Sequence, residues 1–147
     1  MIKIKININT SIILLCLLFT LSSCYDNNIY FDINSQCVVS CNKKVIENLH
    51  IISKDNKDFY FFSKLPKLNG TNSFNLVEIN HSYSLENMNR EISIDSFRLR
   101  PETEYEIVNS TFGDAASSKI LIKTNKKGKV AYSNIKACKW YVQLQYL

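Results

Sequence analysis

The sequence predicts an all-β protein built as a single β-sandwich of short strands. Two observations lead to this fold class. Apolar and polar residues alternate with a period of two through most of the chain, as they do in strands with one buried face. In addition, no stretch of ten or more residues has the period of an amphipathic helix. Short strands parted by turn residues are typical of two packed sheets.

The first 23 residues differ from the rest and have the pattern of a signal peptide. Lys3 and Lys5 precede an apolar run at residues 12–19. This run is too short for a comfortable membrane span, but it has the length of a signal-peptide core.

The next four residues, Leu21, Ser22, Ser23 and Cys24, resemble the lipobox of bacterial lipoproteins. The resemblance implies that Cys24 is lipidated and becomes the first residue of the mature chain, acylated on its amine. Two or three acyl chains, at about 0.8 kcal/mol per buried CH₂, anchor a small domain to a bilayer. We therefore expect membrane lipid as a partner through Cys24 and the bacterial cell envelope as the location. The alternative is an ordinary secretory signal, with Cys24 unmodified.

One domain is expected after the signal peptide. Removal of residues 1–23 leaves 124 residues, enough for one domain with its own core. The polar residues 24–36 are predicted as a lipidated tether, and residues 37–147 as the sandwich. The 16 basic and 13 acidic residues that remain give a formal charge of +3, which gives no basis for nucleic-acid binding.

The predicted strands are short and rich in β-branched and aromatic residues. They lie at residues 48–52, 59–62, 74–79, 91–94, 105–108 and 119–123. Asn69-Gly70 and residues 126–129 are predicted turns. Residues 84–90, with Leu85 and Met88 three positions apart, are the one segment compatible with a helical turn.

A last strand is predicted at residues 138–146. Its apolar residues alternate onto one face: Cys138, Trp140, Val142, Leu144 and Tyr146. This alternation places Cys138 on the buried side.

Three cysteines outside the signal peptide and lipobox predict one disulfide, since the expected location is oxidising. Cys37 and Cys41 are about 13 Å apart if the chain between them is extended, too far to bridge each other. We expect Cys41 to pair with Cys138, and Cys37 is the alternative partner. A zinc site from the three cysteines and His50 is a rival interpretation, although the spacing matches no common zinc pattern.

A local motif, Leu99-Arg100-Pro101-Glu102-Thr103-Glu104-Tyr105, resembles the L-x-P-x-T-x-Y tyrosine corner of fibronectin type III domains. The resemblance covers residues 91–125. It implies that Pro101 fixes the turn between sheets, that Leu99 fills the end of the core, and that the Tyr105 hydroxyl bonds back to the corner backbone.

The chain also departs from that family. Asn109 stands at a position that is normally apolar, an early tryptophan is missing, and a further strand is predicted where the family ends. We therefore expect an immunoglobulin-like, fibronectin type III-like sandwich with an added C-terminal strand.

No residue pattern predicts catalysis. His50 lies within a strand pattern, and His81 lies in a polar loop without a motif around it. The three glycines, Gly70, Gly113 and Gly128, are too few and too scattered for a phosphate-binding loop. We expect no catalytic residue, no metal, no cofactor and no enzymatic activity.

The predicted binding element is the loop that follows the strand after the corner, because this architecture presents contact residues there. It contains Phe112, Gly113 and Asp114. Phe112 is an exposed aromatic anchor in this interpretation, and a cap on the core in the alternative one.

Two functions fit these features. The first is a membrane-anchored module that binds an envelope or secreted protein; its specific form is an immunity lipoprotein that blocks a toxin. The second is a structural or glycan-contacting component of the envelope or surface.

Overall fold

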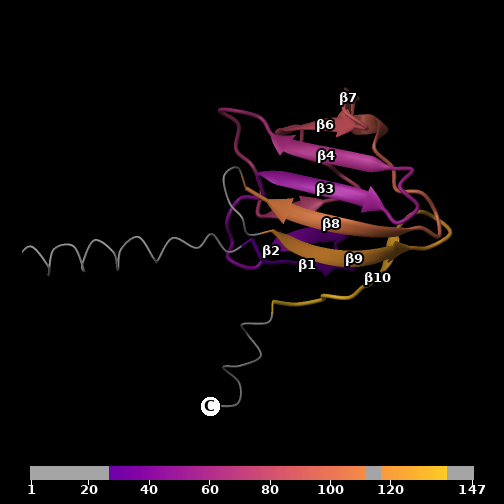
Figure 1. Ribbon diagram of the computed structural model, residues 1–147. Coiled ribbons are helices and arrows are strands. Elements are labelled where there is room, and N and C mark those ends of the chain that lie inside the picture. Colours follow the sequence, from indigo (N-terminus) through magenta and orange to yellow (C-terminus); the bar gives the residue numbers. More distant parts are fainter. Residues whose placement is uncertain (1–26, 112–116, 139–147) are drawn as a thin grey trace, which may run out of the picture.

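The computed structural model describes residues 27–111 and 117–138. These residues form a β-sandwich of two antiparallel sheets (Figure 1), which confirms the predicted fold class. The smaller sheet contains, in order, β1 (Ile29–Asp32), β2 (Cys37–Ser40) and β5 (Ser73–Asn75). The larger sheet contains, in order, β10 (Val130–Ser133), β9 (Ser118–Thr124), β8 (Glu104–Ser110), β3 (Asn48–Ser53), β4 (Phe59–Lys64), β6 (Tyr83–Asn87) and β7 (Arg90–Glu91).

The core lies between the sheets because every second residue of the central strands is apolar. In β8 the residues alternate strictly, and Tyr105 and Ile107 are buried while Glu104 and Glu106 face outward. The two sheets meet through aromatic rings, with the centroids of Phe62 and Phe74 5.0 Å apart in an edge-to-face arrangement.

A connection from β7 to β8 covers part of the inner face of the larger sheet. It contains the short 3₁₀ helix η1 (Ile94–Ser96), and Phe97 directly after this helix is buried. The Phe97 ring lies edge-to-face 4.9 Å from Tyr60 and 5.1 Å from Phe62. Residues 97–99 are thereby held at the end of the core.

The sandwich has two ends that matter for function. The corner end holds the start of β8, the β3–β4 turn and the β9–β10 turn (Figure 1). The tether end holds the start of β1, because the Ile29 amide donates to Ser118 Oγ at the start of β9, at 3.4 Å. Strand β8 runs from the corner end to the tether end.

A disulfide between Cys41 and Cys138 fastens the tether end, as predicted. The two Cα atoms are 5.5 Å apart and the residues are 97 positions apart in sequence. Cys37, the alternative partner, is a buried free thiol. The segment before Cys138 follows β1, since the Phe31 amide donates to the Ile135 carbonyl at 3.0 Å. The predicted strand at residues 138–146 lies outside the described residues apart from Cys138 itself.

Some local predictions differ from the structure. The predicted tether contains β1, in which Ile29 and Phe31 are buried, so the sandwich includes residues before Cys37. Residues 84–90, which were compatible with a helical turn, lie instead in the hairpin of β6 and β7. The predicted strand at residues 91–94 ends at Glu91 and is followed by η1.

Two further elements differ from expectation. Strand β5 covers only the first part of the predicted strand at residues 74–79, and β10 was not predicted at all. Residues 1–26, with the expected signal peptide and Cys24, lie outside the described part. Between residues 27 and 138, leaving aside 112–116, no helix is long and apolar enough to span a membrane.

Candidate functional site: a basic pocket beside the tyrosine corner

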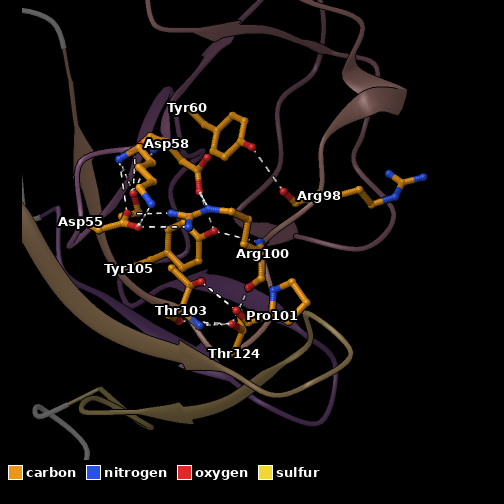
Figure 2. A network of polar contacts seen from close by, with 11 residues as sticks. Asp55, Asp58, Tyr60, Arg98, Arg100, Pro101, Thr103, Tyr105 and Thr124 are labelled. Carbon is orange, nitrogen blue, oxygen red and sulfur yellow. Dashed lines mark hydrogen bonds and ion pairs between the residues drawn. The ribbon is translucent and has the colours of Figure 1, made fainter.

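The Tyr105 hydroxyl bonds back to the corner backbone, as the motif predicts. The expected turn between sheets at Pro101 is wrong, because β7 and β8 on either side of it both belong to the larger sheet. Tyr105 is fully buried, and its hydroxyl accepts a hydrogen bond from the Arg100 amide at 2.9 Å. The same hydroxyl donates to Asp58 Oδ2 at 2.9 Å (Figure 2). Burial raises the pKa of Tyr105 to about 12, with a further contribution from the Asp58 carboxylate.

Two aspartates of the β3–β4 turn hold Arg100. Its Nε donates to Asp58 Oδ2 at 2.7 Å, and its two terminal nitrogens donate to the Asp55 carboxylate at 3.1 and 2.7 Å. Hydrogen bonds from Arg100 lower the pKa of Asp55 below its ordinary value of 3.8. Asp58 carries no recognisable motif, because its role depends on a fold that brings the β3–β4 turn against the corner.

Threonine hydroxyls bind further backbone groups of the corner. Thr124 Oγ1 donates to the Arg100 carbonyl at 2.6 Å and accepts from the Thr103 amide at 2.9 Å (Figure 2). Thr103 Oγ1 donates to the Pro101 carbonyl at 2.8 Å. The corner is therefore fixed to β9 as well as to the β3–β4 turn.

A solvent-open pocket of about 250 Å³, here called the corner pocket, lies next to this network. Its apolar lining comes from Leu76, Val77, Phe97 and Leu99. Three cationic side chains also line it: Arg98, Lys127 and Lys129. Gln36 and Gly128 complete the lining, which contains no carboxylate.

Arg98 is positioned by contacts on both its backbone and its side chain. The Tyr60 hydroxyl donates to the Arg98 carbonyl at 3.3 Å, and Figure 2 shows the Arg98 side chain extending away from the corner network. Its Nη1 donates to the backbone carbonyls of Asp95 and Phe97. No other acceptor within the described residues contacts this guanidinium, so Nε and Nη2 remain available to a ligand.

The two lysines are positioned by the β9–β10 turn. Asn125 Oδ1 accepts hydrogen bonds from the amides of Lys127 and Lys129, at 2.8 and 3.2 Å. Gly128 between them has a positive φ of 74° and lies so close to Leu99 that a Cβ would stand 2.6 Å from the Leu99 carbonyl oxygen. The turn is therefore pressed against the corner, with a lysine on either side of the glycine.

The electrostatic character of the corner pocket differs from that of the outer sheet face. On that face the charges are paired across strands, with Lys119 3.0 Å from Glu106 and Lys54 2.6 Å from Glu104. Within the described part of the chain, none of the three cations of the corner pocket forms an ion pair. Their combined field favours an anionic ligand.

A second open pocket of about 330 Å³ adjoins the first and shares Val77, Phe97 and Arg98 with it. Its lining also includes Ile79 and Ile94, and a histidine and an aspartate in contact, with His81 Nε2 3.6 Å from Asp95 Oδ1. The lining of the corner pocket is thus basic, whereas the lining of the second pocket contains both basic and acidic side chains.

The residues predicted as the lipidation site and the binding loop are not among those that the structure describes. Cys24 and the loop residues Phe112, Gly113 and Asp114 lie outside the described residues. His50 lies in β3, as expected, and its ring stacks on Phe61 with centroids 4.6 Å apart. In residues 27–111 and 117–138, no group of three or more histidine, cysteine, aspartate or glutamate side chains is placed to hold a metal ion.

Comparisons with protein-family models, with curated proteins and with solved structures gave no significant match for this chain.

Proposed function

We propose that this protein is a non-enzymatic lipoprotein of the bacterial cell envelope that binds another protein through its sandwich domain. The lipobox at Leu21 to Cys24 supports the anchor. The observation that carries the binding role is the corner pocket, which is lined by three cations without an ion pair among the described residues and by the exposed side chain of Val77. Exposed apolar surface with unneutralised charge beside it is a feature of recognition sites.

The rigidity of the frame favours recognition by a preformed surface. The corner network fixes one side of the pocket and the Asn125 turn fixes the other. A ligand that binds such a surface does not have to order it first, which lowers the entropic cost of association.

The anchor is tested by replacing Cys24. We expect the Cys24→Ser variant to lose the mass of the acyl chains and to leave the detergent-extracted membrane fraction, whereas the Cys37→Ser variant stays lipidated. An unmodified Cys24 in the mature wild-type protein would contradict the lipoprotein proposal.

The binding role is tested by site-specific photo-crosslinking in the native cells. A photoreactive residue replaces Val77, which is 54% exposed in the corner pocket, or Leu68, which is 47% exposed at the tether end. We expect one protein to be crosslinked from position 77 and not from position 68. A toxin or hydrolase as that protein would favour the immunity form of the proposal. Adducts with wall material or abundant outer-membrane proteins alone would favour a structural component instead.

A further inference from the structure

The position of the corner pocket relative to the expected anchor determines what can reach it. Only four residues lie between Cys24 and Ile29, the first residue of β1. The start of β1 lies at the tether end, where the Ile29 amide contacts Ser118. A lipid on Cys24 therefore holds this end of the sandwich close to the bilayer.

The corner pocket lies at the opposite end. Its cations come from the corner before β8 and from the β9–β10 turn. The tether end, which the lipid would hold, contains instead the last residues of β8 and the first residues of β9. Strand β8 has seven residues, which span about 20 Å. At physiological ionic strength the Debye length is about 8 Å, so the charge of lipid headgroups is largely screened at that distance.

The side chains of the pocket also specify the chemistry of the ligand. The free edge of the Arg98 guanidinium, Nε and Nη2, matches the fork geometry of a carboxylate. Lys127 and Lys129 add two flexible cations to the lining of the same pocket. Val77 and Leu99, which also line it, offer contact to an apolar side chain.

From this placement we propose that the corner pocket binds an acidic segment of a protein, one in which carboxylates flank an apolar side chain, on the face of the domain that points away from the membrane. This inference rests on the proposed function and names the chemistry of its partner. The apolar anchor enters beside Val77, and the carboxylates contact Arg98 and the two lysines.

The test uses the full-length lipidated protein in nanodiscs of phosphatidylcholine and a display library of random 12-residue peptides. We expect the selected peptides to contain at least two aspartates or glutamates next to a large apolar residue. Their affinity should fall at least tenfold with the charge-reversed variant Lys127→Glu/Lys129→Glu, and it should weaken as salt is raised.

The matched control is Lys43→Glu/Lys44→Glu, which makes the same change in net charge near Cys41 at the tether end. We expect less than a twofold effect on peptide affinity from this variant. Selected peptides without acidic residues, or equal losses with both variants, would overturn the inference.

A second arm tests a membrane as the ligand. A photoreactive residue at Val77 is activated in nanodiscs that contain phosphatidylglycerol, with and without a selected peptide. We expect adducts with the peptide only, and adducts with lipid would overturn the inference. If position 77 crosslinks a protein in cells but Lys127→Glu/Lys129→Glu leaves that crosslink unchanged, the proposed binding function stands and the acidic chemistry alone fails.

Discussion

At the scale of single residues, the hydroxyl of Tyr105 connects the corner backbone at Arg100 with the β3–β4 turn at Asp58. It accepts from the Arg100 amide and donates to Asp58, and both contacts measure 2.9 Å. Without the oxygen, a backbone donor and a largely buried carboxylate each lose a partner. An unsatisfied buried polar group costs more than the net gain of an ordinary hydrogen bond, so this one atom has a disproportionate effect on stability.

The substitution Tyr105→Phe tests this point. We expect the free energy of unfolding to fall by about 1–3 kcal/mol, because the ring still fills the core while the two hydrogen bonds are lost. Urea unfolding followed by fluorescence measures the change. The control is Tyr132→Phe, at a position that is 53% exposed, for which we expect a change within about 0.5 kcal/mol. Equal stabilities of the two variants would contradict a structural role of the hydroxyl.

The raised pKa of Tyr105 predicts a loss of stability in alkali. Its pKa is about 12 in the folded protein against an ordinary value of 10.0, so the folded state keeps the proton that the unfolded chain releases first. The protonated Tyr105 hydroxyl therefore contributes fully to the free energy of unfolding below pH 10, and this contribution is lost as the pH rises toward 12. We expect the stability gap between the wild type and Tyr105→Phe to narrow over this range in urea titrations. A gap that stays constant would show that the hydroxyl ionises alike in both states.

At the scale of elements, the β9–β10 turn determines the form of the pocket. Its main chain is held by Asn125, and Gly128 allows it to approach Leu99. The φ of 74° at Gly128 is one that other residues adopt only with strain. A side chain at this position would also meet the Leu99 carbonyl oxygen.

We expect Gly128→Ala to lower the free energy of unfolding by about 1–3 kcal/mol, because strain and the close contact act together. Thermal unfolding followed by circular dichroism measures this loss. Lys126→Ala in the same turn is the control, and it should remain within about 0.5 kcal/mol of the wild type. A neutral Gly128→Ala would mean that the turn moves away from the corner at little cost.

The elements that the sequence predicted well are those whose side chains alternate over a long strand. Strands β8 and β9 have seven residues each and bury every second one, so their period is unmistakable. Strand β1 has only four residues between polar neighbours such as Asn28 and Asn34, so its alternation of Ile29 and Phe31 is too short to establish a period.

The β6–β7 hairpin was missed for a different reason. Its turn places Met88 and Asn89 at φ values of 49° and 62°, without the glycine that usually marks such turns. The spacing of Leu85 and Met88, three positions apart, is compatible with a helical turn. In the structure, however, Leu85 is buried in a strand and Met88 is 52% exposed.

The corner pocket could be predicted only in pieces. The sequence predicts both the motif around Tyr105 and the turn at residues 126–129. The turn supplies Lys127 and Lys129 to the pocket, and Arg98 directly precedes the motif. Their proximity, and that of Val77 after β5, arises from pairing of strands far apart in sequence. No local pattern carries that information.

At the scale of the whole molecule, the two ends of the sandwich are fastened by different means. Hydrogen bonds and ion pairs of Arg100 and Tyr105 join the segments at the corner end. The Cys41–Cys138 disulfide joins the segments at the tether end. A covalent link between positions 97 apart restricts the unfolded chain strongly, and in the chain-entropy model such a loop contributes about 4–5 kcal/mol.

The double variant Cys41→Ala/Cys138→Ala is therefore expected to lose about 4–5 kcal/mol of unfolding free energy, measured by urea unfolding without reductant. Cys37→Ala is the control, and it should cost only about 1 kcal/mol because the buried thiol of Cys37 closes no loop. Because the disulfide lies at the end opposite the corner pocket, the fraction of the double variant that stays folded should bind acidic peptides as the wild type does. An equal loss for Cys37→Ala would contradict the pairing, and a loss of peptide affinity in the folded double variant would contradict the separation of the two ends.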